Sequence, residues 1–148
     1  ITATGFNLSI LGDIPFTIDG KALNFGDCWA HRGVLYSGIP NMAWVFGYFR
    51  ASWTLRADMM GDFVCRLLQQ MDRQGANVVV PALRPQDQGM AMKPWIEADN
   101  FNPGYMNRGV GLMPRQGSHA PWLHSQDYAA ERLEMPVADL GDGSLVYR

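Results

Sequence analysis

The strongest periodic pattern in the sequence lies between residues 53 and 74. Apolar residues recur there at a spacing of four, with further apolar positions beside them: Leu55, Met59, Met60, Phe63, Val64, Leu67, Leu68 and Met71. This repeat predicts an amphipathic helix over 53–74 that buries one face. Ser52 or Thr54 is a suitable N-cap, and Gly75 provides the stop.

A short apolar run precedes this helix. Residues 42–46 (Met-Ala-Trp-Val-Phe) contain no polar residue, follow a Pro40-Asn41 turn and end at Gly47. Continuous apolar runs of this length are typical of strands that are buried on both faces. We therefore predict a buried strand at 42–46, then a glycine turn, then the long helix.

Two further strand patterns occur near the beginning of the sequence. Residues 1–4 (Ile-Thr-Ala-Thr) alternate β-branched and small side chains before Gly5, as in a core strand that leaves a sheet. Such a strand needs neighbours for its backbone groups, so we expect the chain to be part of a longer protein. Farther on, two alternating runs flank Asp19-Gly20, which predicts a two-stranded ribbon.

Residues 77–148 have a different character. Residues 78–80 and 145–147 each predict a short strand, and short helical turns are expected near 104–112 and 126–133. Frequent prolines prevent long helices, whereas large aromatic residues argue against disorder; the aromatic residues are Trp95, Phe101, Tyr105, Trp122 and Tyr128. We expect an irregular arm whose aromatic side chains pack on a neighbouring surface.

These elements together predict a mixed α/β fold with short strands, one long helix of about five turns and an irregular tail. The chain has 148 residues, which is the length of one ordinary domain. Charged residues make up only 18%, so we expect part of the surface to be covered by another part of the protein.

Charge and hydropathy exclude several classes of partner. The net charge of −2 gives no basic surface for nucleic acid or for an anionic membrane. No apolar run approaches the roughly 20 residues that a membrane-spanning helix needs. We therefore expect neither a nucleic-acid partner nor a membrane span.

Two cysteines and three histidines are the candidate reactive or metal-binding residues. Cys28 and Cys65 have no CxxC spacing, and we expect reduced, buried thiols in a cytoplasmic protein. His31, His119 and His124 are too widely spaced for a metal motif. We predict structural or surface roles for the histidines and no metal site.

The strand, turn and helix at 42–74 have two interpretations. Backbone N–H groups at a helix N-terminus that follows a strand can hold an anionic ligand. Many such units bind nothing and serve only the packing of the fold. The pattern alone favours packing.

Several segments, however, resemble one protein family. The likeness extends in order over almost the whole chain, and its segments are residues 1–6, 37–42, 51–55, 63–68, 103–105, 113–117, 121–122 and 126–128. They resemble the C-terminal part of class B flavoprotein monooxygenases. The likeness is to the Baeyer–Villiger and flavin-containing type, which includes bacterial ethionamide monooxygenase.

The resemblance implies a parent protein with two Rossmann-like dinucleotide-binding domains, one for FAD and one for NADPH. In such enzymes NADPH reduces the flavin, and a peroxyflavin inserts one oxygen atom of O2 into a ketone or a soft heteroatom of a small organic substrate. Residues 1–76 would be the end of the FAD-binding domain and residues 77–148 a C-terminal wrapping arm. The missing N-terminal part of the same protein would be the main partner.

The resemblance also assigns site residues. Ala3, Thr4 and Gly5 match the family's linker from the NADPH domain to the FAD domain. The 42–46 strand would complete the FAD-domain sheet. The turn after it and the helix N-terminus would face the flavin, where the helix dipole favours negative charge. The implied cofactor-binding residues are Gly47, Tyr48, Arg50, Ala51, Ser52 and Thr54.

Other family features have no counterpart in this chain. No GxGxxG motif follows a strand, and we assign no catalytic residue. We expect the chain alone to be inactive, to bind neither cofactor tightly and to self-associate through exposed apolar surface. Two alternatives stay open: a non-catalytic interaction module that binds a partner through its aromatic arm, and a flavoprotein with a regulatory role.

Overall fold

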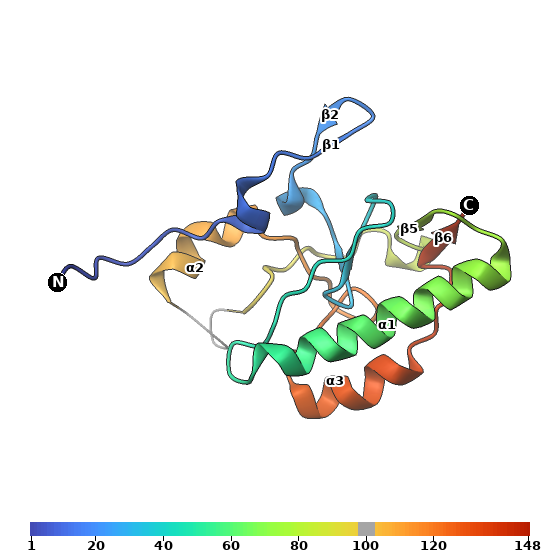
Figure 1. The fold of residues 1–148 in the computed structure, drawn as a ribbon. Coiled ribbons are helices and arrows are strands. Elements are labelled where there is room, and N and C mark those ends of the chain that lie inside the picture. Colours follow the sequence, from blue (N-terminus) through green and yellow to red (C-terminus); the bar gives the residue numbers. More distant parts are fainter. Residues whose placement is uncertain (98–102) are drawn as a thin grey trace.

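The computed structural model describes residues 1–97 and 103–148, which form a mixed α/β fold. Within these residues the strands pair into three two-stranded antiparallel sheets. Figure 1 shows α3 lying alongside the long helix α1, with the β5–β6 sheet next to the C-terminal half of α1. The elements are β1 (Thr17–Ile18), β2 (Lys21–Ala22), β3 (Ala30–His31), β4 (Leu35–Tyr36), α1 (Trp53–Gln74), β5 (Val79–Pro81), α2 (Gly104–Gly109), α3 (Tyr128–Glu134) and β6 (Leu145–Tyr147).

Helix α1 covers the residues that the periodicity predicted. Its inner face buries Met60, Phe63, Leu67 and Met71 against apolar residues of β4, β5, β6 and the tail. Gly75 ends the helix in the left-handed conformation, with φ at +63°, which glycine adopts without steric strain. One face of α1 therefore forms the centre of the first core.

The tail packs on the same chain rather than away from it. The predicted helical turns are α2 and α3, and the two predicted strands pair as β5 and β6. Arg66 of α1 holds the tail by donating to the carbonyls of Met135 and Ala138, each at 2.7 Å. Trp95 and Trp122 are fully buried, so these aromatic anchors belong to this chain's own core. Phe101 lies outside the described residues.

A second core is mainly aromatic. The ring of Trp95 lies 5.6 Å from Trp44 and 5.5 Å from Phe46, and Tyr36 lies 5.9 Å from Trp44. Tilted and edge-on pairs at these distances add to the energy of burial. This cluster joins the N-terminal hairpins, the segment before α1 and the tail.

The hairpins show what local sequence signals predict and what they miss. The ribbon across Asp19-Gly20 is confirmed, with Thr17 opposite Ala22. The β3–β4 hairpin was not predicted, because its turn places Arg32 at φ +53° beside Gly33 at φ +66°. Arginine rarely adopts this backbone conformation, so the sequence carries no turn signal there.

The two remaining predicted strands are not formed within this chain. Residues 1–9 lie in no helix or strand, Ile1 to Asn7 are exposed, and Figure 1 shows this segment running away from the body. Residues 42–46 are extended, but Ala43 and Val45 are exposed while Phe46 is buried. Neither segment is part of a sheet among the described residues. The Trp44 N–H donates to the Val34 carbonyl at 2.9 Å, but one such bond does not make a ladder.

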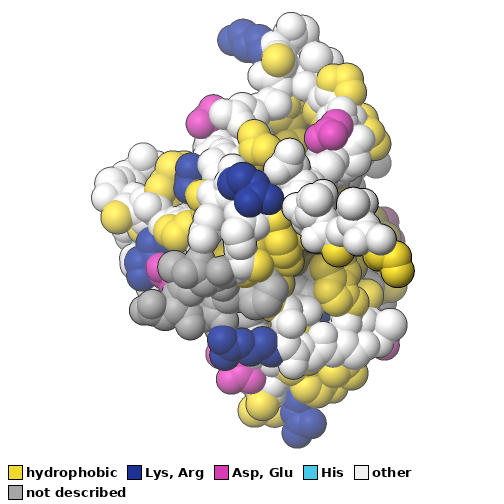
Figure 2. Space-filling view, turned by 90° about the vertical axis from the view of Figure 1, so that its left-hand side faces the viewer, with side chains coloured by type: hydrophobic (Ala, Val, Ile, Leu, Met, Phe, Trp, Pro, Cys, Tyr) yellow, Lys and Arg dark blue, Asp and Glu magenta, His cyan; other side chains and the backbone are white. Residues whose placement is uncertain are grey.

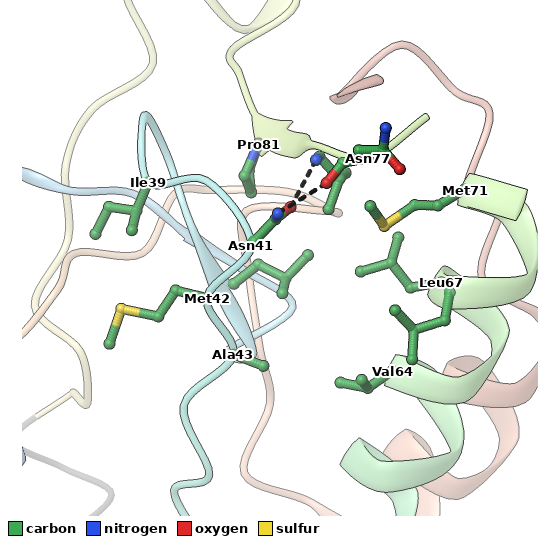
Figure 3. A pocket seen from close by; sticks show the side chains of 12 residues that line it. Ile39, Asn41, Met42, Ala43, Val64, Leu67, Met71, Asn77 and Pro81 are labelled. Atoms are coloured by element: carbon green, nitrogen blue, oxygen red, sulfur yellow. Dashed lines mark hydrogen bonds between the residues drawn. The ribbon is translucent and has the colours of Figure 1, made fainter. Parts of the chain in front are cut away.

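An apolar groove runs beside the extended segment (Figure 3). Helix α1 forms one wall and residues 41–43 form part of the other. Asn41 closes one end, since its Nδ2 donates to the Asn77 carbonyl and its Oδ1 accepts from the Val79 N–H, both at 2.9 Å. The groove has a volume of about 240 Å³ and is lined by Leu35, Ile39, Asn41, Met42, Ala43, Val64, Leu67, Leu68, Met71, Asn77, Val79 and Pro81.

Candidate functional site

The turn that leads into α1 contains the predicted cofactor-binding residues. Its inner side is buried and consists of Gly47 and Tyr48. Its outer side is exposed and consists of Arg50, Ala51, Ser52 and Thr54. The structure therefore keeps the six residues in one turn but divides them between the core and the surface.

The outer side includes the N-terminus of α1. Ser52 occupies the N-cap position, and its hydroxyl is hydrogen-bonded to the Thr54 hydroxyl at 2.8 Å. The Ser52 side chain makes no cap hydrogen bond to this helix in the described structure. The first N–H groups of α1 thus remain available to solvent or to a ligand, at the positive end of the helix dipole.

The inner side is bridged by Gln126 from the tail. Gln126 Nε2 donates to the Gly47 carbonyl at 3.2 Å, and Gln126 Oε1 accepts from the Phe49 N–H at 3.3 Å. One side-chain amide therefore satisfies two backbone groups, as a neighbouring strand would. Sequence reasoning missed Gln126 because a contact across so long a separation leaves no local pattern.

A buried ion pair lies next to the same turn. Arg56 Nε donates to Glu131 Oε2 at 2.9 Å, and the Tyr48 hydroxyl donates to the same oxygen at 2.7 Å. Burial, followed by the hydrogen bond to Glu131, raises the pKa of Tyr48 far above its ordinary value. Tyr48 is therefore a fixed hydrogen-bond donor and not a base.

Gly47 allows the turn to pass close to α1. A Cβ atom at this position would lie 2.3 Å from Cγ of Trp53. The Trp53 ring in turn lies 5.2 Å from the ring of Phe46. The absence of a side chain at Gly47 is thus what lets the backbone turn and the helix start pack together.

The predicted linker residues are not part of this arrangement. Ala3, Thr4 and Gly5 are exposed. Figure 1 places the N-terminal segment that contains them apart from the turn before α1. The structure of this chain does not bring the two predicted groups together.

The cysteines are both free thiols. Cys28 is buried, and burial raises its pKa to about 11, with a smaller contribution from Asp27, so this thiol is unreactive. Cys65 is exposed, which corrects the expectation that both are buried. Within residues 1–97 and 103–148, no group of three or more His, Cys, Asp or Glu side chains is placed to hold a metal ion.

A buried carboxylate organises another part of the tail. Asp87 is fully buried and accepts hydrogen bonds from Arg84, His119 and Trp122. The hydrogen bonds from Arg84 are the main reason that the pKa of Asp87 lies well below its ordinary value. The ionised Asp87 therefore joins two segments of the tail, residues 84–87 and residues 119–122.

No helix among the described residues is long and apolar enough to cross a membrane.

Gly47→Ala is expected to lower the free energy of unfolding by about 1–3 kcal/mol, because the new methyl group collides with Trp53. Denaturant unfolding followed by circular dichroism measures this change. Gly61→Ala is the matched control, since a Cβ at Gly61 meets no atom within 4 Å and helix propensity favours alanine by up to about 1 kcal/mol. Equal destabilisation of the two variants would contradict the proposed contact.

Stability is expected to fall as the pH drops from 6.5 towards 3. Burial lowers the pKa of His31 and of His124 from 6.5 to about 3. The unfolded chain therefore binds protons in this range that the folded chain does not, and each ring contributes a slope of up to about 1.4 kcal/mol per pH unit. Unfolding curves between pH 8 and 4.5 test this.

The variant His119→Gln is the control for the pH profile, because His119 is half exposed. Its stability should still decline below pH 6.5. A profile of the unaltered chain that is flat between pH 6.5 and 4.5 would show that neither buried ring stays neutral.

Comparison with curated proteins finds several relatives that are named as monooxygenases. It is 41% identical over 145 residues to a probable FAD-binding monooxygenase, AlmA, of Acinetobacter baylyi. It is 44% identical over 128 residues to the FAD-containing monooxygenase EthA, and 39% identical over 142 residues to the putative FAD-containing monooxygenase MymA, both of Mycobacterium tuberculosis.

These matches cover 98%, 86% and 94% of this chain but only 28%, 25% and 28% of the relatives. The chain thus spans between a quarter and three tenths of the length of the relatives it matches. No family profile matches the chain, and no solved structure matches it. With identities of 39–44% over most of its length, the chain is homologous to the C-terminal part of proteins named as FAD-containing or FAD-binding monooxygenases.

Proposed function

We propose that the chain is the C-terminal part of an FAD- and NADPH-dependent monooxygenase. The enzyme would insert one oxygen atom of O2 into a ketone or a soft sulfur or nitrogen atom of a small organic substrate. FAD, when bound, supplies the chemistry that takes electrons from NADPH and activates O2. The observation that carries the proposal is the similarity to FAD-containing monooxygenases over almost the whole chain.

In this proposal the turn at 47–54 forms part of the wall of the flavin pocket. Its exposed outer side and the uncapped first turn of α1 offer backbone N–H groups beside the positive end of a helix. Such groups suit the carbonyl oxygens of a flavin and negative charge on its ring. Tyr48, which is buried and bonded to Glu131, would support the turn from behind.

We further propose that the N-terminal part of the same protein covers the exposed apolar surface. The extended segment 42–46 would join a sheet of that part, and the groove of Figure 3 would receive apolar side chains from it. Leu68, which lines this groove, is 53% exposed, and Val45 of the extended segment is 47% exposed. Figure 2 shows further exposed hydrophobic side chains on the face it presents, interspersed with charged residues. Exposed apolar surface of this kind favours an interface.

The remaining assignments follow from the same proposal. Residues 1–76 would end the FAD-binding domain, with Ala3, Thr4 and Gly5 as its linker, and residues 77–148 would form the wrapping arm. The dinucleotide-binding loops and the catalytic residues would lie in the N-terminal part, because this chain contains no GxGxxG motif. The chain alone would therefore be inactive.

Comparison of the complete gene product with the isolated chain tests this function. The complete product is expected to carry stoichiometric FAD, to oxidise NADPH with uptake of O2, and to oxygenate a simple ketone or sulfide. The isolated chain should do none of these. NADPH oxidation without any oxygenated product would support the regulatory alternative, and FAD-dependent NADPH oxidation by the isolated chain would contradict the proposed division.

The isolated chain is expected to self-associate through the groove. Leu68→Glu places a charge on the groove wall, so light scattering should show a lower average mass for this variant than for the unaltered chain. Leu133→Glu is the control, because Leu133 is also exposed, at 67%, and does not line the groove. A strictly monomeric unaltered chain, or equal masses for both variants and the unaltered chain, would contradict association through this groove.

A further inference from the structure

We infer that residues 126–131 of the tail set the conformation of the turn at 46–49, with Gln126 and Glu131 as positioning residues for the cofactor site. The inference rests on the proposed function, because that function gives the turn its role. The tail would then do more than cover the core, because it would also fix the backbone of a turn that contacts the cofactor. The contacts that support this inference are made by Gln126 and Glu131, which lie at the two ends of segment 126–131.

Gln126 contacts the turn directly and is itself held in an uncommon backbone conformation. Its φ is +57°, in a region that non-glycine residues seldom occupy. Its backbone N–H donates to Glu131 Oε1 at 3.2 Å, which stabilises that conformation. In this position the side-chain amide reaches both the Gly47 carbonyl and the Phe49 N–H. The strained backbone conformation of Gln126 is therefore what directs its side chain to the turn.

Glu131 forms the hub of the arrangement. Oε2 accepts from the Tyr48 hydroxyl and from Arg56 Nε, while Oε1 accepts from the Gln126 N–H and, at 3.4 Å, from Arg56 Nη2. Each carboxylate oxygen therefore has two donors, and the side chain is only 6% exposed. Asp127 caps the start of α3 through the N–H groups of Ala129 and Ala130, which fixes the helix that carries Glu131.

Arg56 connects Glu131 to Phe46, the first residue of the turn. Its side chain is 2% exposed, and its Nη1 donates to the Phe46 carbonyl at 2.9 Å. Its Nη2 also donates to the Arg32 carbonyl at 3.4 Å. A change in α3 would therefore act on the turn at two places, at Phe46 through Arg56 and at Gly47 and Phe49 through Gln126.

The chemical nature of these contacts supports a positioning role. A buried ion pair contributes little net stability compared with well-packed apolar side chains. Its hydrogen bonds, however, define the direction of each backbone group that they reach. The polar groups thus specify the path of the turn from 46 to 49, whereas apolar packing alone would leave that path less defined.

Gln126→Ala in the complete gene product tests this role, because it removes the contacts to the turn but keeps the Arg56–Glu131 pair. Leu133→Ala is the control, because Leu133 lies on α3 with an exposed side chain. In Gln126→Ala, hydrogen–deuterium exchange of the Phe49 amide should be about tenfold faster, as expected for one lost hydrogen bond. The dissociation constant of FAD should rise at least about fivefold, with a changed visible circular dichroism band of the flavin.

The outcomes separate the two proposals. Unchanged exchange at Phe49 in Gln126→Ala would overturn the positioning role. Faster exchange with unchanged FAD affinity and unchanged dichroism would show that the tail sets a turn that does not contact the cofactor, which also overturns the inference. A complete gene product that binds no FAD at all would instead overturn the proposed function. If Leu133→Ala changed the exchange at Phe49 and the FAD affinity equally, the cause would be general destabilisation. That result would overturn the specific role of Gln126.

Discussion

The buried contact between Arg56 and Glu131 is the interaction on which the arrangement of this chain depends most. It joins the first turn of α1 to α3 across 75 residues of sequence. The same guanidinium also binds the Phe46 carbonyl and the Arg32 carbonyl. Two helices, a hairpin turn and the extended segment thus share one desolvated cation, and a buried charge of this kind requires all its partners.

Local signals in the sequence were sufficient where a structure depends on neighbouring residues. The apolar repeat of α1, the left-handed Gly75 and the Asp19-Gly20 turn were all predicted and are confirmed. Long-range polar contacts were not predicted, since nothing near Gln126 or Glu131 indicates that they reach the turn at 46–49. The candidate turn was found only through the family resemblance; strand, turn and helix alone favoured packing.

The two predicted strands that this chain does not form have one physical cause. Residues 1–4 and 42–46 have the composition of core strands, yet neither is part of a sheet among the described residues, and the single hydrogen bond from the Trp44 N–H to the Val34 carbonyl does not make a ladder. Side-chain pattern is a property of the segment, whereas a strand is a property of at least two segments. Exposed Val45 and the groove along α1 are the surfaces that, in the function proposed above, the rest of the protein would cover.

An experimental structure of the complete gene product with bound FAD tests the central claim most directly. The account predicts that residues 42–46 form a strand paired with another segment of the protein. It also predicts that the flavin contacts the outer side of the turn at 47–54 while Gln126 holds its inner side. A structure in which residues 42–46 remain unpaired and the flavin lies away from this turn would contradict the account.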